Sequence, residues 1–312
     1  MLAIFESTLP IFLLVVLGII LKRLPIIDQK VWPGLEQIAY WFLYPALLFI
    51  TIYNADFGGL RLDAMLVALV LSILIMATLL GLLWPVLKRT GLVAATEYSS
   101  VFQTAMRWNG FIALAIAQKM FPPAGSAVVA LVMAVIIIPI NVFSVFVVTK
   151  FADSSANWAR IGRTMALNPL ILAALFAILM RFAPFRIYDP INETLILVAN
   201  AALGMGLITI GAGLRIADIA SLRFPLWLPV FLKLAVFPII LISLAWSLGL
   251  DGTQLQYLAL CAAVPTAMNG YLLAKQLGGD AELYAAVTTL QTALSFFSIP
   301  AVLALTAQLT SG

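Results

Sequence analysis

Histidine is absent from this sequence of 312 residues, and cysteine occurs once, at Cys261. The chain therefore lacks the commonest transition-metal ligand and the usual proton shuttle of enzymes. A single thiol forms no disulfide within the chain, so cysteine usage does not indicate a redox compartment. The sequence also has no G-x-x-x-x-G-K-[ST] loop, no H-E-x-x-H motif and no C-x-x-C pair. These absences argue against an enzyme and predict no catalytic residue, no bound metal and no cofactor.

Charged residues are scarce as well: they make up 10% of the chain, whereas hydrophobic residues make up 64%. Soluble domains contain about 25% charged and about 45–50% apolar residues. So few charges cannot cover a surface that faces water, so most of the surface must face lipid. The net charge of +4 does not indicate nucleic-acid binding, because the basic residues stand at the ends of apolar runs. The predicted class is an all-α membrane protein whose main partner is the lipid bilayer.

Apolar runs between charges and turn residues predict ten transmembrane helices, called predicted helices 1 to 10 below. In chain order they cover residues 6–22, 35–53, 63–87, 97–119, 125–149, 166–182, 192–213, 225–248, 255–276 and 282–306. Residues 151–165 hold the longest polar connection and are predicted to be a short cytoplasmic linker. The linker separates a first half, 1–150, from a second half, 166–312.

The placement of lysine and arginine predicts the orientation of these helices. One set of connections contains eleven basic residues: Lys22, Arg23, Lys30, Lys88, Arg89, Lys150, Arg160, Arg163, Arg215, Arg223 and Lys275. The opposite set contains four: Arg61, Lys119, Arg181 and Arg186. Because cytoplasmic connections are enriched in basic residues, the first set should be cytoplasmic and both termini should lie outside. The expected location is the plasma membrane, which in a bacterium is the inner membrane.

The two halves share short sequence motifs in the same order. The matches are Pro10 with Pro169 (offset 159), Thr104-Ala105-Met106 with Thr266-Ala267-Met268 (offset 162), Asn109-Gly110 with Asn269-Gly270 (offset 160) and Pro139 with Pro300 (offset 161). Four matches near one offset indicate an internal repeat of five helices. Since five is an odd number, the two repeats must cross the membrane in opposite directions, as in many secondary transporters.

Predicted helices 4 and 9 are each interrupted at mid-span by residues that disfavour a helix. Asn109-Gly110 stands in the first, and Pro265 with Asn269-Gly270 stands in the second. Matched breaks in inverted repeats indicate a binding site at the midplane. The N-terminal end of a half-helix presents free N–H groups and partial positive charge, which suits an anion such as a carboxylate. The candidate binding residues at the breaks are Asn109, Gly110, Pro265, Thr266, Asn269 and Gly270; simple kinks are the alternative.

Two cations stand inside predicted helices. Arg107 lies beside the break of predicted helix 4, and a charge at that depth costs about 2.5–3.5 kcal/mol on insertion scales, which favours a binding role for a substrate anion. Its alternative roles are to extend to the membrane interface or to bind carbonyls freed at the break. Lys233 lies in predicted helix 8 and could tune the site, occupy the place of a coupling cation, or extend to the interface.

Carboxylates are absent from the middle of every predicted span, which argues against a buried carboxylate proton relay. Na⁺ is still a possible coupling ion, because carbonyls and neutral side-chain oxygens can coordinate it, and H⁺ is the other. Thr104 and Gln291 are the candidate support or ion-site residues, together with the hydroxyls of Thr288, Thr292, Ser295 and Ser298. Glycines of predicted helix 7 should allow close packing between helices: Gly204, Gly206, Gly211 and Gly213.

A set of short motifs, in order along nearly the whole chain, resembles the auxin efflux carrier family. They are Leu9-Pro10-Ile11, Tyr44-Pro45-Ala46, Arg107-Trp108-Asn109-Gly110, Asn168-Pro169-Leu170, Gly211-Ala212-Gly213-Leu214, Val264-Pro265-Thr266-Ala267 and Ser298-Ile299-Pro300. The resemblance implies a ten-helix inverted-repeat fold similar to the bile acid sodium symporters. In it, helices 1, 2, 6 and 7 form a scaffold, through which a homodimer would form. Helices 3–5 and 8–10 carry the substrate as an elevator.

The expected function is therefore a secondary transporter that exports a small organic anion. Bacterial relatives are linked with malonate, malate and similar dicarboxylates, and plant relatives with the auxin indole-3-acetate. Helix 4 here has no proline and the linker is short, and both features depart from the plant pattern. Two alternatives remain: a sodium-coupled importer of the bile acid type, and a membrane receptor or sensor that binds an anion without moving it.

Overall fold

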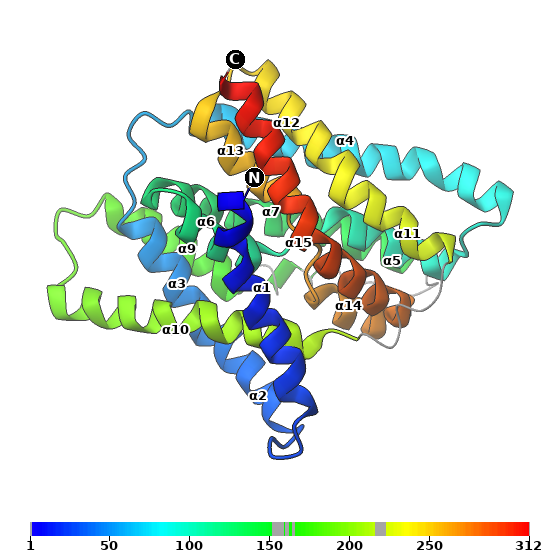
Figure 1. The fold of residues 1–312 in the computed structure, drawn as a ribbon, viewed down its shortest axis with the longest axis horizontal. Helices are drawn as coiled ribbons and strands as arrows, with labels where there is room; N and C mark the ends of the chain where they lie inside the picture. Colours follow the sequence, from blue (N-terminus) through cyan, green and yellow to red (C-terminus); the bar gives the residue numbers. More distant parts are fainter. Residues whose placement is uncertain (1, 152–158, 160–161, 164–165, 216–222, 312) are drawn as a thin grey trace.

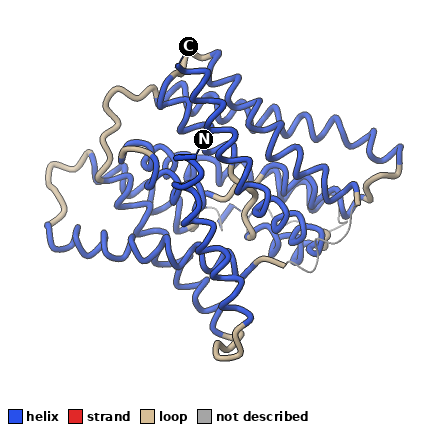
Figure 2. Tube along the Cα trace, viewed as in Figure 1, coloured by secondary structure: helices blue, strands red, loops and turns tan. Residues whose placement is uncertain are grey.

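The computed structural model describes all residues except 1, 152–158, 160–161, 164–165, 216–222 and 312, and all regular structure in the described part is helical (Figures 1 and 2). The first half contains α1 (Leu2–Arg23), α2 (Val31–Ile38), η1 (Ala39–Leu43), α3 (Tyr44–Tyr53), α4 (Leu62–Thr90), α5 (Ala95–Met106), α6 (Gly110–Met120) and α7 (Pro123–Phe151). The second half contains α9 (Pro169–Arg181), α10 (Asp189–Gly213), α11 (Phe224–Phe231), η3 (Leu232–Val236), α12 (Phe237–Ser247), α13 (Gly252–Ala263), α14 (Asn269–Leu277) and α15 (Ala281–Ser311). The segments η1 and η3 are π-helical turns inside longer helices, and most of the predicted linker lies outside the described residues.

Seven described stretches are long and apolar enough to cross a membrane. They are Ile4–Arg23, Val31–Tyr53, Leu62–Thr90, Pro123–Phe151, Asp189–Gly213, Phe224–Ser247 and Ala281–Leu309. Of the other three predicted spans, one contains the shorter helix α9, and two are divided into pairs of short helices, α5–α6 and α13–α14. The chain is thus a multi-pass all-α membrane protein, and the crossing by all ten runs stays a prediction.

Both predicted interruptions are confirmed. Helix α5 ends at Met106 and α6 begins at Gly110, with Arg107 in an extended conformation (φ −71°, ψ 159°). Helix α13 ends at Ala263, and Val264 is extended (φ −70°, ψ 149°). This conformation is expected before Pro265, because the proline ring excludes the helical region for the preceding residue.

Helices α1 and α10 cross with their backbones in contact. A Cβ atom at Gly211 of α10 would lie 1.9 Å from the carbonyl oxygen of Val15 in α1, so only glycine fits there. A Cβ at Gly206 would lie 2.7 Å from the hydroxyl of Tyr44 in α3. The predicted close packing is therefore confirmed at Gly206 and Gly211, whereas Gly204 faces open space.

Two cations at corresponding places in the halves cap helices of the opposite half. Lys22, at the end of α1, donates to the carbonyl of Ala212 at the end of α10 (2.5 Å). Arg181, at the end of α9, donates to the carbonyls of Ile52 and Tyr53 at the end of α3 (both 3.1 Å). A cation at a helix C-terminus satisfies free carbonyls and interacts favourably with the helix dipole. Residues 22 and 181 are 159 positions apart, the same offset that relates Pro10 to Pro169.

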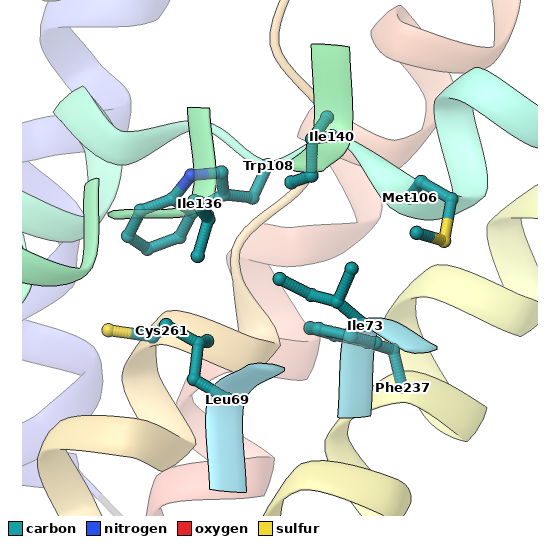
Figure 3. A pocket seen from close by; sticks show the side chains of 8 residues that line it. All are labelled: Leu69, Ile73, Met106, Trp108, Ile136, Ile140, Phe237 and Cys261. Carbon is teal, nitrogen blue, oxygen red and sulfur yellow. The ribbon is translucent and has the colours of Figure 1, made fainter. Parts of the chain in front are cut away.

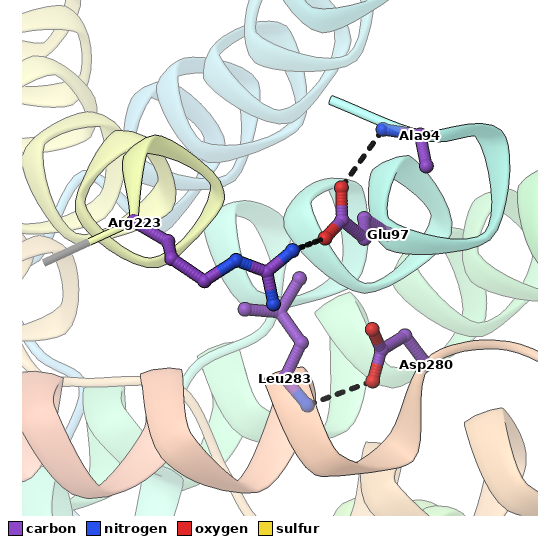
Figure 4. A network of polar contacts seen from close by, with 5 residues as sticks. All are labelled: Ala94, Glu97, Arg223, Asp280 and Leu283. Carbon is purple, nitrogen blue, oxygen red and sulfur yellow. Dashed lines mark hydrogen bonds and ion pairs between the residues drawn. The ribbon is translucent and has the colours of Figure 1, made fainter. Parts of the chain in front are cut away.

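The remaining helices, α4–α7 and α11–α15, pack around the two breaks, with the long α15 against α5, α11, α13 and α14. Figure 4 shows how their ends are joined: Glu97 of α5 accepts from the backbone N–H of Ala94 (2.8 Å) and forms an ion pair with Arg223, just before α11. Asp280 caps the start of α15 by accepting from the N–H of Leu283 (2.9 Å). The ion pair joins α5 to the start of α11, whereas the other two bonds are local caps of α5 and α15.

Candidate functional site

The two breaks touch each other directly. The backbone N–H of Asn109 donates to the carbonyl of Pro265 (2.7 Å), which joins the first break to the second. The side chain of Asn109 caps α6, because its Oδ1 accepts from the N–H of Ile112 (3.2 Å). One free donor of that half-helix is thus satisfied by the protein itself, and the carboxamide NH₂ of Asn109, not its oxygen, is left over. Gly110 is buried, and a Cβ there would press on the side chain of Met133.

Arg107 lies at this junction and is held by three carboxamides. Its Nε donates to Gln103 one turn earlier in α5 (3.3 Å), one terminal nitrogen donates to Asn141 of α7 (3.0 Å), and the other approaches Asn269 of α14 (3.5 Å). The residue is only 5% exposed. In the described part of the chain, the ion pair of Arg223 is the only salt bridge, so no carboxylate neutralises the Arg107 guanidinium.

The exposed member of the junction belongs to α14. Asn269, the first residue of α14, is exposed, whereas Asn109 is 2% exposed. Tyr284 of α15 packs against the next residue: a Cβ at Gly270 would lie 2.3 Å from the Tyr284 hydroxyl. The same hydroxyl donates to the carbonyl of Ala267 (2.5 Å). The predicted Gly270 is therefore required by close packing at the second break.

Gln291 of α15 joins three chain segments. Its Oε1 accepts from the N–H of Thr266 in the second break (2.9 Å). Its Nε2 donates to the carbonyl of Thr104, near the end of α5 (3.2 Å), and to that of Pro229 in α11 (3.0 Å). The side chain is fully buried, and its oxygen is already occupied by a protein donor.

Lys233 lies in η3 and is fully buried. Its ammonium donates to the carbonyl of Ala262 at the C-terminal end of α13 (3.4 Å) and lies 4.2 Å from the ring centre of Phe237. The alternative that its side chain extends to the interface is therefore wrong, because packing on α13 encloses it. A cation at the end of a half-helix is favourable for the helix dipole.

The structure thus brings together Arg107, Asn109, Pro265 and Asn269, and Gln291 links Thr104 to Thr266. Sequence reasoning missed Asn141, Gln103 and Tyr284. The sequence does mark Asn141 as a candidate, since it is a carboxamide inside an apolar run, two residues after Pro139. The hydroxyls of Thr288, Thr292 and Ser295 bond carbonyls of their own helix.

A small apolar cavity lies behind the first break (Figure 3). It is lined by Leu69, Ile73, Met106, Trp108, Ile136, Ile140, Phe237 and Cys261, and its volume is about 10 Å³. A cavity of this size and character holds no more than one water and usually stays dry. It is too small for an organic ligand, so the polar junction is the better candidate site.

Comparison with known proteins agrees with a transport role. Residues 159–303 match the model of the membrane transport protein family. The chain is also similar to an uncharacterized transporter of Methanothermobacter thermautotrophicus, with 24% identity over 304 residues that cover 95% of this chain and 96% of the relative.

Proposed function

Because the chain belongs to the membrane transport protein family, the family of the auxin efflux carriers, we propose that it is a secondary transporter that exports a small organic anion. The family is one of transporters, not of enzymes. The proposed substrate is a carboxylate, a dicarboxylate or an auxin-like weak acid. The proposed location is the plasma membrane, or the inner membrane of a bacterium, with both termini outside.

The buried guanidinium of Arg107 is the observation that carries this proposal. It is held by neutral carboxamides and has no carboxylate partner among the described residues, so its positive charge is available to a ligand. At 4 Å and an effective dielectric constant of about 20, a pair of opposite unit charges interacts by about 4 kcal/mol. The main alternative role, binding of carbonyls freed at the break, is not supported, because the side chain contacts carboxamide oxygens instead.

The proposal includes two five-helix repeats of opposite orientation and an elevator movement. The scaffold unit would be α1, α2–α3, α9 and α10, through which two copies would pair, and the transport unit would be α4–α7 and α11–α15. The reciprocal capping by Lys22 and Arg181 supports the repeat. Arg215, just after α10, crosses between the units: it donates to the hydroxyl of Tyr271 in α14 (2.9 Å), and its backbone N–H donates to Thr289 in α15 (3.0 Å). An elevator movement would have to break these contacts.

Export without a coupling ion is favoured over sodium-coupled import. A sodium site at broken helices is built from free carbonyl oxygens. Here several carbonyls at or near the breaks already accept a protein donor, among them those of Thr104, Pro265, Ala262 and Ala267. Lys233 supplies a fixed cation at the end of α13, in the manner of a bound ion. An inside-negative potential favours exit of an anion by about 2.3 kcal/mol per charge per 100 mV, so efflux needs no further energy source. Flux in proteoliposomes should therefore follow an imposed potential and persist when Na⁺ is removed; flux that stops without Na⁺ would support the importer instead.

Binding and flux of a panel of mono- and dicarboxylates test the role of Arg107. Arg107→Gln should weaken binding of a carboxylate on the order of 10²–10³-fold, the loss expected for about 4 kcal/mol. Arg107→Lys keeps the charge and should retain part of the binding. Arg186→Gln, at an exposed loop position, is the matched control and should leave both quantities unchanged. Wild-type affinity in Arg107→Gln would refute the proposal, and binding without flux in the wild type would identify a receptor or sensor.

A further inference from the structure

The three carboxamides around Arg107 all have the same orientation. The oxygens of Gln103, Asn141 and Asn269 point toward the guanidinium. This orientation is fixed by chemistry, because arginine has only donors and a carboxamide can meet it only with its oxygen. Asn109 is oriented by the same logic, since its oxygen accepts from a backbone N–H at the start of α6.

The four NH₂ groups are consequently left over. None of them donates a hydrogen bond within the part of the chain that the structure describes. For Gln103 the case is the sharpest, because the residue is fully buried and its Nε2 has no partner. A buried unpaired donor costs about 1–3 kcal/mol, so such groups normally have an acceptor.

Several acceptors at the junction are, in contrast, already in use. The carboxamide oxygens bind the guanidinium or cap α6. The carbonyls of Pro265 and Ala267 in the second break accept from Asn109 and Tyr284, and those of Thr104 in α5 and Ala262 in α13 accept from Gln291 and Lys233. The junction therefore offers a ligand N–H groups and a positive charge, but none of these oxygens is vacant.

We propose that this donor-only junction selects anions that carry acceptors alone, and that it discriminates against otherwise similar acids with a hydroxyl or ammonium group. The inference rests on the proposed function and narrows its substrate class to plain and oxo-carboxylates. A ligand carbonyl can accept from the unpaired NH₂ groups, whereas a ligand hydroxyl must leave water and finds each of these carboxamide and carbonyl oxygens already bonded to a donor. Sites that leave one polar partner unpaired discriminate much more strongly than sites that only test size.

Matched pairs of acids test the inference, because each pair has one charge state and one carbon skeleton. Purified wild-type protein should bind pyruvate more tightly than lactate, and oxaloacetate more tightly than malate, by about tenfold or more. Equal affinity within the pairs, or preference for the hydroxy acids, would overturn this inference and leave the anion proposal standing. Failure to bind any of the four acids would overturn both.

A substitution at one NH₂ group tests the mechanism. Asn109→Asp keeps an oxygen for the cap of α6 but replaces the NH₂ with a second oxygen, which can accept a hydroxyl. The added charge weakens binding of pyruvate and lactate alike, so the readout is the Kd of lactate divided by the Kd of pyruvate. That ratio should fall at least several-fold. Asn168→Asp is the matched control, since Asn168 caps α9 in the same manner and the ratio should not change there. An unchanged ratio in Asn109→Asp would contradict the proposed role of the NH₂ groups.

Discussion

Replacement of Gln291 by methionine should destabilise the protein without creating a large cavity. Methionine has nearly the same length, but it supplies neither the acceptor for Thr266 N–H nor the donors for the carbonyls of Thr104 and Pro229. Side-chain hydrogen bonds in membrane proteins contribute about 0.6 kcal/mol on average and about 1.7 kcal/mol at most. Three such bonds correspond to a loss of about 2 kcal/mol at the average and about 5 kcal/mol at the upper end. Because the side chain is fully buried, water cannot take over these bonds, and we expect a value in the upper half of this range.

The assay is reversible unfolding of purified protein in mixed micelles, with flux in proteoliposomes as a second readout. Thr292→Ala is the matched control: Thr292 is the next residue of α15 and equally buried, but its hydroxyl bonds only the carbonyl of Thr288 in its own helix (2.8 Å). The control should lose less than about 1 kcal/mol. In Gln291→Met we also expect flux to fall further than stability explains, because both breaks lose a shared anchor. Equal stability of the two variants would refute the reasoning that Gln291 holds the breaks together.

Two more predictions concern packing and movement. Gly211→Ala places a Cβ against backbone atoms of α1, so it should lower the free energy of unfolding by more than about 3 kcal/mol in the same unfolding assay. The control is Gly204→Ala, where the new Cβ faces open space, and it should change the free energy of unfolding by less than about 1 kcal/mol. Arg215→Ala removes the bond to Tyr271 across the units, so it should change the maximal rate of flux but leave substrate Kd unchanged. Lys275→Ala, on the same helix as Tyr271, should alter neither quantity, and a matching change in both arginine and lysine variants would exclude a specific contact.

The helix breaks could be predicted because local chemistry determines them. Pro265 forces Val264 out of the helical region, and Asn109 supplies a cap at the start of α6. The ten apolar runs were equally visible, because hydropathy depends on composition rather than on packing. Gln103 also had a local signal, since it stands one helical turn before Arg107, at the spacing that brings side chains together on a helix.

The partners of the buried polar groups could not be predicted, because they come from segments far apart in the chain. In the sequence, Gln291 is one of several polar residues in the last predicted helix. It has three partners only because α5, α11 and the second break meet at α15. Lys233 reads as a residue able to reach the interface. The π-helical turn at its position and the close approach of α13 enclose it instead. In both cases tertiary packing overrides the local interpretation.

The proposed binding charge stands where the sequences of the two proposed repeats differ. Thr-Ala-Met and Asn-Gly are adjacent in the second repeat, at residues 266–270, but Arg107 and Trp108 stand between them in the first, which is why the offset falls from 162 to 160. Without a proline, α5 stays helical through Met106, and the extended segment begins at Arg107 itself. In the second half Pro265 ends the helix earlier, so the matching motif Thr266-Ala267-Met268 lies between α13 and α14. The proposed repeat would account for two breaks in contact, and the two additional residues of the first half place a single guanidinium beside them. A site with one cation and a ring of carboxamides cannot neutralise two carboxylates at once, so a dicarboxylate would have to place its second charge toward exposed Asn269 and solvent.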